Sequence, residues 1–221
     1  MTSHRVPKRA LPAHSKNHFG RRRWLNGTTL PRVLACSMAA KGKNGAMLKN
    51  CMVLAFLDDI YEDLELWYPK LRLEEAGYSL KCCAPEIKTY TGKHGYPAAA
   101  DLLLKDTRSE DFCGLLVPGG FMPDKLRRDP KVLSLTREFF ERGQLVAFIC
   151  HGGWIPISAK ILQGKRVTGS LGIKDDLENA GGIWVNEPVV VDGNLISSRT
   201  PRDLAPFGAA MVDFLKRDKT V

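Results

Sequence analysis

The most reactive combination of residues in the sequence is Cys150-His151-Gly152-Gly153, which directly follows an apolar run. The run, Val146–Ile149, is typical of a strand covered on both faces of a parallel sheet. The two glycines can adopt backbone conformations closed to other residues, and apolar residues recur at helical spacing over 154–162. Cys150 therefore lies at a predicted strand–turn–helix elbow, where free N–H groups and the helix dipole favour thiolate. That position predicts a nucleophile, although a free cysteine is more often a small buried apolar residue.

Three other loops are expected to lie beside this elbow. In an open parallel sheet, ligands bind beyond the carboxyl ends of the strands, so the segments after those ends should meet. We therefore expect one pocket built from the segments Asp58–Glu62, Pro118–Gly120, Cys150–Gly152 and Ser198–Pro201.

Glu62 is the candidate acid beside the Cys150 thiol. A carboxylic acid that burial keeps protonated can hydrogen-bond the sulfur or move a proton. The alternative is a carboxylate that caps the helix expected directly after it. The residues alone leave both interpretations open.

His151 and a glycine pair are candidate donors to an oxyanion. Adjacent residues on a helix do not face each other, so the His151 ring need not touch the sulfur. Its backbone N–H is the better-placed group, with the Gly119 and Gly120 amides opposite.

Two further polar residues are less specific. Arg199 either binds an anionic group or pairs with an aspartate, for which the candidates are Asp175, Asp176 and Asp203. His94 lies between two glycines and is interpreted as a loop residue.

The elements that must position these residues alternate between strands and helices. This alternation implies right-handed crossovers and an α/β sandwich, with a mostly parallel sheet between helices on both faces. Asp129 as N-cap, Pro130 in the first turn and Gly143 after the last turn make the second helix the clearest. Pro69 is expected to interrupt the first helix, and residues 91–104 form an irregular excursion. Strands are predicted at 52–57, 78–84, 114–120, 146–149, 166–169, 183–191 and 195–198, and helices at 64–77, 129–143, 154–162, 174–182 and 202–216.

The net charge of +9 comes from one end of the chain. Residues 1–46 contain ten Arg/Lys and no Asp/Glu, which leaves 23 basic against 24 acidic residues in 47–221. We predict that 1–46 is a disordered extension and 47–221 the folded domain. The extension resembles a transit peptide poorly, because prolines interrupt it. Either it is a basic arm that binds nucleic acid or an acidic membrane surface, or it precedes the true start at Met47.

The cysteines indicate neither a metal site nor a disulfide framework, since none forms a C-x-x-C motif. No apolar run approaches the roughly 20 residues that span a bilayer, and no secretory segment is present. A soluble, cytoplasmic protein in a reducing compartment is the expectation. The six cysteines are Cys36, Cys51, Cys82, Cys83, Cys113 and Cys150.

Several longer motifs resemble the DJ-1/PfpI superfamily, nearest its branch of PfpI-type intracellular proteases and glyoxalase III or deglycase enzymes. The resemblance covers about residues 52–215 and implies a flavodoxin-like fold. The motifs that carry it are YEDLEL, GKHGYP, LLVPGG, ICHGGW, GIKDDLENAG and VVVDGNLISSRTPRDL.

The resemblance also implies roles for the site residues. Cys150 is the nucleophile, Glu62 is the acid beside its sulfur, and Gly120 with His151 supplies the oxyanion donors. Protease-type members orient the histidine with an acid from a neighbouring subunit, which implies a homo-oligomer. The matching residue here is Asp124, where a glutamate is commoner, and Gly153 replaces the usual proline.

These residues suit three functions. The first is a glyoxalase III or deglycase reaction on a small dicarbonyl, which needs no cofactor or metal. The second is a cysteine peptidase with a His151–Asp124 pair, and the third is a redox sensor or chaperone whose Cys150 is oxidised. A glutamine amidotransferase would need a His-x-Glu downstream, but His151 is the last histidine. We predict the first function, with the peptidase as the alternative.

Overall fold

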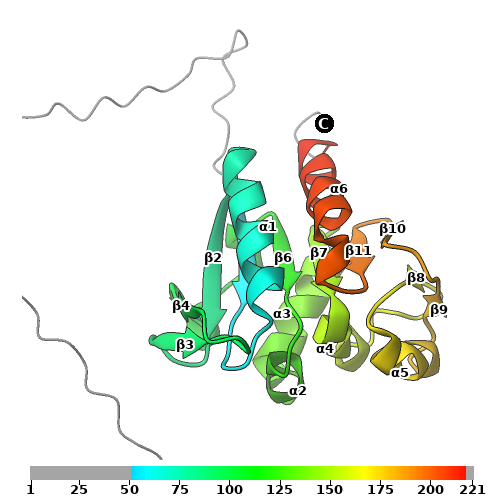
Figure 1. Ribbon diagram of the computed structural model, residues 1–221, viewed down its shortest axis with the longest axis horizontal. Helices are drawn as coiled ribbons and strands as arrows, with labels where there is room; N and C mark the ends of the chain where they lie inside the picture. Colours follow the sequence, from blue (N-terminus) through cyan, green and yellow to red (C-terminus); the bar gives the residue numbers. More distant parts are fainter. Residues whose placement is uncertain (1–50, 218–221) are drawn as a thin grey trace, which may run out of the picture. The chain divides into compact units, whose positions relative to one another are not determined.

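Seven strands form the central sheet of the computed structural model, which describes residues 51–217 (Figure 1). Every neighbouring pair is parallel except β10 with β11. The sheet order is β10 (Val189–Asp192), β11 (Leu195–Ser198), β7 (Leu145–Ile149), β6 (Gly114–Val117), β1 (Met52–Phe56), β2 (Ser79–Ala84) and β5 (Leu102–Leu103). The predicted flavodoxin-like, mostly parallel sheet is confirmed. The expected extension 1–46 and the boundary at Met47 lie outside the described residues.

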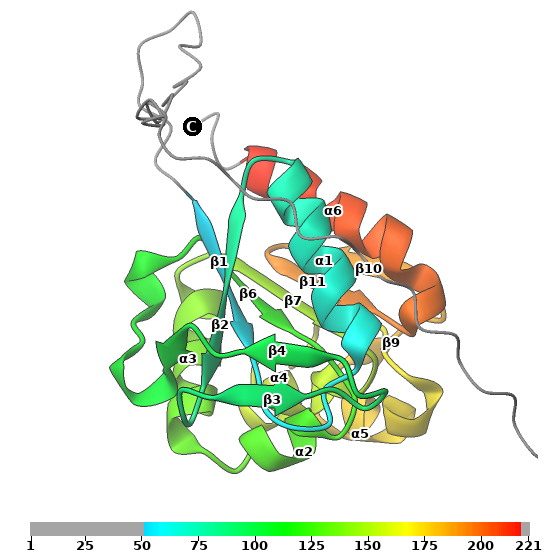
Figure 2. The ribbon, with the colours of Figure 1, turned by 60° about the vertical axis from the view of Figure 1, so that its left-hand side comes forward.

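Helices cover both faces of the sheet. Figures 1 and 2 show α1 (Asp63–Glu75) and α6 (Leu204–Arg217) side by side on one face, with α3 (Pro130–Glu141) and α4 (Trp154–Ser158) on the other. Two short helices, α2 (Met122–Leu126) and α5 (Lys174–Asn179), flank α4. The excursion expected over 91–104 begins at the end of β3 (Thr89–Thr91), which forms a hairpin with β4 (Pro97–Ala99). Strand β8 (Arg166–Val167) pairs with β9 (Ile183–Trp184). The 3-10 turns are η1 (Leu104–Asp106), η2 (Ser109–Asp111), η3 (Cys150–Gly153), η4 (Leu171–Ile173) and η5 (Pro201–Asp203).

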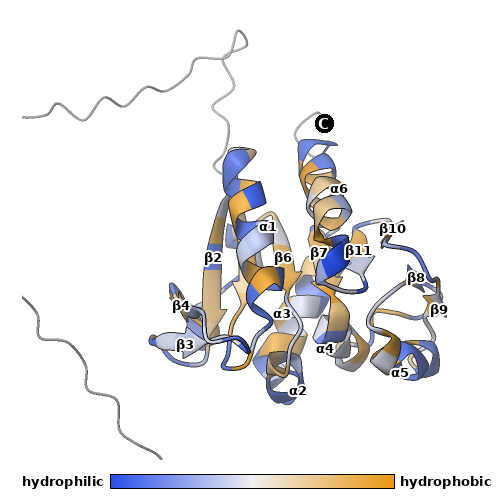
Figure 3. Ribbon diagram, in the orientation of Figure 1, coloured by the Kyte–Doolittle hydropathy of each residue, from blue (hydrophilic) through white to orange (hydrophobic). Residues whose placement is uncertain are grey.

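The core lies between the central strands and the helices. All residues of β6 and β7 are buried, as two-sided coverage requires, and Figure 3 shows apolar residues concentrated in the central strands. Helix α3 buries Val132, Leu135 and Phe139 at helical spacing. The Asp129 side chain accepts a hydrogen bond from Lys131 N at 2.8 Å, so the predicted cap is confirmed.

Three expectations for the helices are wrong. The helix expected over 174–182 ends at Asn179. Helix α1 continues through Pro69, because a proline removes only one hydrogen bond of the helix, the one to the carbonyl of Glu65 four residues earlier. The helix expected over 154–162 ends at Ser158, and Lys160 then takes a left-handed conformation with φ 58°.

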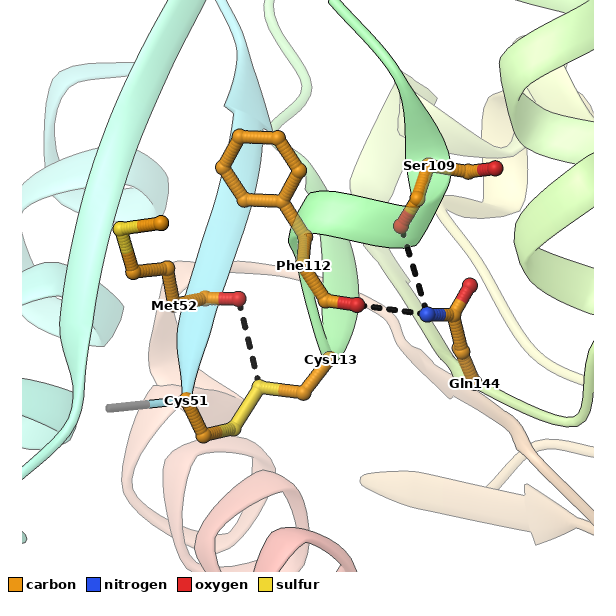
Figure 4. The surroundings of a disulfide bond; sticks show 6 residues. All are labelled: Cys51, Met52, Ser109, Phe112, Cys113 and Gln144. Carbon is orange, nitrogen blue, oxygen red and sulfur yellow. Dashed lines mark hydrogen bonds between the residues drawn. A yellow bond between two sulfur atoms is a disulfide. The ribbon is translucent and has the colours of Figure 1, made fainter. Parts of the chain in front are cut away.

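A disulfide joins Cys51 and Cys113, so the prediction of reduced cysteines outside any disulfide is wrong (Figure 4). Strands β1 and β6 are neighbours, with Val53 opposite Gly114, which brings the residues before each strand together. The two Cα atoms are 5.6 Å apart although 62 positions separate them in the sequence. Gln144 Nε2 donates to the Phe112 carbonyl at 2.5 Å and holds this segment. The free cysteines of the described residues are Cys82, Cys83 and Cys150.

No helix within residues 51–217 combines the length and the apolar character that a membrane crossing requires.

Candidate active site

The carboxyl ends of β1, β6 and β7 bring three of the four expected segments together. A backbone bridge pairs Tyr61 with Gly120, and Glu62 N donates to the Gly119 carbonyl at 3.1 Å. The elbow at Cys150 packs against Gly119. The fourth segment, after β11, is used differently: Arg199 binds Asp203 at 2.9 and 3.1 Å and Asn186 at 2.9 Å. Arg199 is expected from the sequence either to bind an anionic group or to pair with an aspartate, and the structure shows the pair with Asp203.

The elbow holds Cys150 in an unusual backbone conformation. Its φ of 57° lies in the left-handed region, which costs a residue with a side chain about 1–2 kcal/mol. Close contacts with β6 maintain it. A Cβ at Gly152 would lie 2.4 Å from the Val117 carbonyl oxygen, and a Cβ at Gly119 would lie 2.9 Å from Cys150 Cβ. Only glycine fits both positions, which explains the glycines on either side of the thiol.

Glu65, not Glu62, is the acid beside the thiol. Its side chain is fully buried, and Oε2 accepts a hydrogen bond from Gly119 N at 2.7 Å. A Cβ at Gly119 would lie 2.6 Å from Glu65 Oε2 and 2.9 Å from Cys150 Cβ, so the carboxyl and the thiol flank the same glycine. The second oxygen, Oε1, is buried and has no hydrogen-bond partner within residues 51–217. Glu65 lies in the first turn of α1, on the same face as the buried Leu66 and Pro69. The helix face therefore turns this carboxyl inward.

Glu62 instead holds the turn between β3 and β4. Its Oε2 is 3.3 Å from Lys93 Nζ, and its Oε1 is 3.4 Å from His94 Nε2. Glu62 is the N-cap residue of α1, but its side chain accepts no capping hydrogen bond. Neither the expected contact with sulfur nor the alternative cap is present, because the hairpin offers Glu62 two basic partners.

The His151 ring contacts the sulfur, a contact that helical spacing does not require. Its Nδ1 is 3.2 Å from Cys150 Sγ. Residues 150–153 form the tight turn η3 instead of a regular helix, so the spacing rule for an α-helix does not apply here.

Burial controls the protonation of the site. It raises the pKa of Glu65 to about 8, and it raises the pKa of the Cys150 thiol to about 12, with the Glu65 charge as the second cause. It also lowers the pKa of His151, as does the charge of Lys93. At pH 7 the resting site therefore holds a thiol, a neutral carboxylic acid and a neutral imidazole. The expected thiolate is not the resting form, but Nδ1 can accept the thiol proton.

The Gly120 and His151 amides are the candidate donors to an oxyanion. The Gly119 N–H is already bound to Glu65. The Gly120 N–H donates no hydrogen bond within residues 51–217, and its left-handed φ of 81° turns the backbone at the end of β6. A Cβ there would lie 2.4 Å from the Ile60 carbonyl oxygen, so glycine is required.

Asp124 does not reach the histidine through any contact among the described residues. Its Oδ2 is 2.5 Å from Arg128 Nη2, one turn along the chain, and 44% of its side chain is exposed. No carboxylate hydrogen-bonds the His151 ring within 51–217.

One cluster of the described residues has metal-ligand types, namely Glu62, Asp63 and His94, with ligand atoms within 4.8 Å of one another. Asp63 accepts hydrogen bonds from His94 N at 2.8 Å and Tyr96 N at 2.9 Å. Together with the Lys93 pair, these contacts account for the cluster as the anchor of the hairpin turn.

Comparison with known proteins identifies the family of the chain. Deglycase PH1704 of Pyrococcus horikoshii is 44% identical over 164 residues, which cover 74% of this chain and 99% of that protein. The candidate cysteine protease YraA of Bacillus subtilis is 40% identical over 171 residues, 77% of this chain and 100% of YraA. A solved two-domain protein of Anabaena variabilis, with DJ-1/ThiJ/PfpI-like and ferritin-like domains, has a TM-score of 0.74 at 36% identity, over 75% of this chain and 48% of that one. Residues 51–213 match the DJ-1/PfpI family, and the chain belongs to that family.

Proposed function

We propose that the protein is a cofactor-independent cysteine enzyme of the glyoxalase III or deglycase type, which acts on small dicarbonyls or their adducts. One observation carries the proposal: the Cys150 thiol lies between a buried protonated acid, Glu65, and a neutral base, His151. An acid and a base on either side of a nucleophile suit a reaction that only relocates protons. The similarity to proteins named deglycases supports the same reaction class.

The first step is addition of sulfur to the aldehyde carbon. As the S–C bond forms, the carbonyl electron pair moves to oxygen, which the Gly120 and His151 amides can receive. His151 Nδ1, 3.2 Å from Sγ, takes the thiol proton and returns it to this oxygen. The product is a hemithioacetal, and no electron has left the substrate.

The second step moves a hydrogen from the carbon bonded to sulfur to the neighbouring ketone carbon. His151 removes the proton on the carbon bonded to sulfur while Glu65 protonates the neighbouring carbonyl oxygen. His151 then gives its proton to the neighbouring carbon. The Glu65 carboxylate takes the hydroxyl proton from the carbon bonded to sulfur. This internal isomerisation gives a thioester, which water hydrolyses to a 2-hydroxy acid with return of the thiol.

A peptidase is the second candidate, favoured by the contact between the His151 ring and the sulfur and by the similarity to YraA. It needs a carboxylate on the other side of the ring, which the resemblance assigns to Asp124 of a neighbouring subunit.

The two candidates separate in a parallel assay of wild type, Cys150→Ser and Glu65→Gln on methylglyoxal and on a fluorogenic peptide. The proposal expects lactate from wild type and none from Cys150→Ser. Peptide cleavage by wild type without lactate formation would contradict the glyoxalase or deglycase proposal and support the peptidase. Neither product, with selective peroxide oxidation of Cys150, would favour the redox sensor.

A further inference from the structure

The His151 ring is held by an aromatic neighbour. The centroids of the His151 and Trp154 rings are 5.0 Å apart, with an angle of 66° between the planes. The two residues are three positions apart across the turn η3, and side chains at this spacing eclipse in a 3-10 helix. Edge-to-face contacts at this distance stabilise a fixed ring orientation. No carboxylate of the described residues binds the ring, so the contacts that orient it within residues 51–217 are those with the Cys150 sulfur and with Trp154.

Trp154 is itself fixed from two sides. Its Nε1–H donates to Asp176 Oδ2 on α5 at 2.9 Å. The Arg127 guanidinium, at the end of α2, lies 5.7 Å from the indole centroid, and Ser158 Oγ holds Arg127 through Nε at 2.8 Å. Helix α4 lies between α2 and α5 (Figure 1), so each neighbouring helix contributes one contact to the indole.

The residue before Trp154 packs against the core. A Cβ at Gly153 would lie 2.8 Å from Ile173 Cδ1 and 3.2 Å from Phe148 Cε2. A side chain at position 153 would therefore crowd these core residues.

We propose that Trp154, fixed by Asp176, is a positioning residue that keeps His151 Nδ1 directed at the Cys150 sulfur. This proposal rests on the proposed function only for its kinetic consequence. If the ring turns away from sulfur, the thiol loses its base, and misplacement of a catalytic group by about 1 Å costs on the order of 100-fold in rate. Trp154→Ala should lower kcat by that order and leave KM nearly unchanged.

Alkylation of Cys150 tests the positioning without any substrate. The rate with iodoacetamide is followed against pH, with the modified cysteine identified by mass spectrometry. In Trp154→Ala the rate at pH 7 should fall to that of His151→Ala. Trp154→Phe keeps a ring and should lie between this variant and wild type. Asp176→Ala should match Trp154→Phe, and Asp176→Asn, which still offers an acceptor to Nε1–H, should match wild type.

Double variants give the decisive comparison. In a His151→Ala background, Trp154→Ala should cause no further loss of alkylation rate, and in a Trp154→Phe background Asp176→Ala should have no further effect. Trp184→Phe, which changes an indole of β9, is the control and should leave the pH profile unchanged. Additive losses in either double variant, or a wild-type profile in both Trp154→Phe and Asp176→Ala, would overturn the proposal. Failure of wild type to make lactate, with these alkylation results intact, would overturn only the proposed function.

Discussion

The Glu65 carboxyl carries the proton on which the proposed reaction depends. Glu65→Gln keeps the size of the side chain and an oxygen for the Gly119 N–H, but it removes the transferable proton. Loss of general acid catalysis typically costs 10²–10⁴-fold, so kcat on methylglyoxal should fall by roughly that range. Glu62→Gln is the matched control. It changes only the contacts with Lys93 and His94, and a larger loss in this variant would return the catalytic role to Glu62.

The same residue predicts how stability depends on pH. The pKa of Glu65 rises from 4.5 to about 8 on folding, so the folded protein binds a proton that the unfolded chain has released. The free energy of unfolding should therefore be unaffected below pH 4.5 and should fall as pH rises from 4.5 to 8. The full shift corresponds to at most about 5 kcal/mol.

Urea denaturation of wild type and Glu65→Gln at pH 4.5, 7 and 9 measures this effect. The variant has no titratable group at this position. The difference between its free energy of unfolding and that of wild type should therefore shift in favour of the variant as pH rises, and level off above pH 8. A difference that stays constant with pH would show that burial does not hold Glu65 protonated.

Glu65 also shows what the sequence could and could not predict about the site. The thiol at the elbow and the glycine pair follow from local patterns, and both lie where expected. The choice between Glu62 and Glu65 depends on which face of α1 turns inward. A signal was present, because Glu65 shares helical spacing with the buried Leu66, Pro69 and Leu73, and a glutamate within an apolar stripe needs a function or a partner. The His151 contact depends on a tight turn that no residue pattern specifies.

At the level of the elements, helix α3 offers a test of local sequence signals. The Asp129 side chain caps the helix through Lys131 N, and loss of such a cap typically costs about 1 kcal/mol. Asp129→Ala should lower the free energy of unfolding by about that amount and leave activity unchanged. Lys131→Ala keeps the backbone N–H that Asp129 binds and is the matched control. Equal stabilities of the two variants would show that the cap does not stabilise α3.

Elements with strong local signals were predictable, and those that depend on distant contacts were not. Asp129, Pro130 and Gly143 mark α3 within two residues. The two-residue strand β5 exists only because Leu102 and Leu103 pair with the end of β2. The disulfide likewise depends on the pairing of β1 with β6, a long-range contact that spacing along the chain does not reveal.

At the scale of the whole molecule, the disulfide is expected to stabilise the fold. It closes a loop with a sequence separation of 62, for which restriction of the unfolded chain gives about 4 kcal/mol. A reductant should therefore lower the thermal midpoint of wild type to that of Cys51→Ser/Cys113→Ser. The double variant should not respond to reductant. A wild-type midpoint indifferent to reductant would mean that the bond adds no stability.

The proposed homo-oligomer concerns the unpaired side of the His151 ring. If Asp124 of a neighbouring subunit orients this ring, Asp124→Asn should lose activity without unfolding, because the imidazole loses its tautomer control. Mixing Asp124→Asn with Cys150→Ser subunits should restore part of the activity, since some mixed sites combine an intact thiol with an intact acid. A fully active monomer in sedimentation, or free subunit exchange without recovery, would contradict the shared site.

The bond between Cys51 and Cys113 also makes the polypeptide a closed ring with two tails. Glu65 and the hairpin turn lie inside the ring, and Cys150 lies on the tail beyond it. A tryptic cut after Lys93, whose side chain is 46% exposed, would leave two pieces that migrate as one molecule in electrophoresis until a reductant separates them. One piece would carry the acid of the proposed pair and the other the thiol. The redox state of one bond would then decide whether Glu65 and Cys150 remain in one covalent molecule.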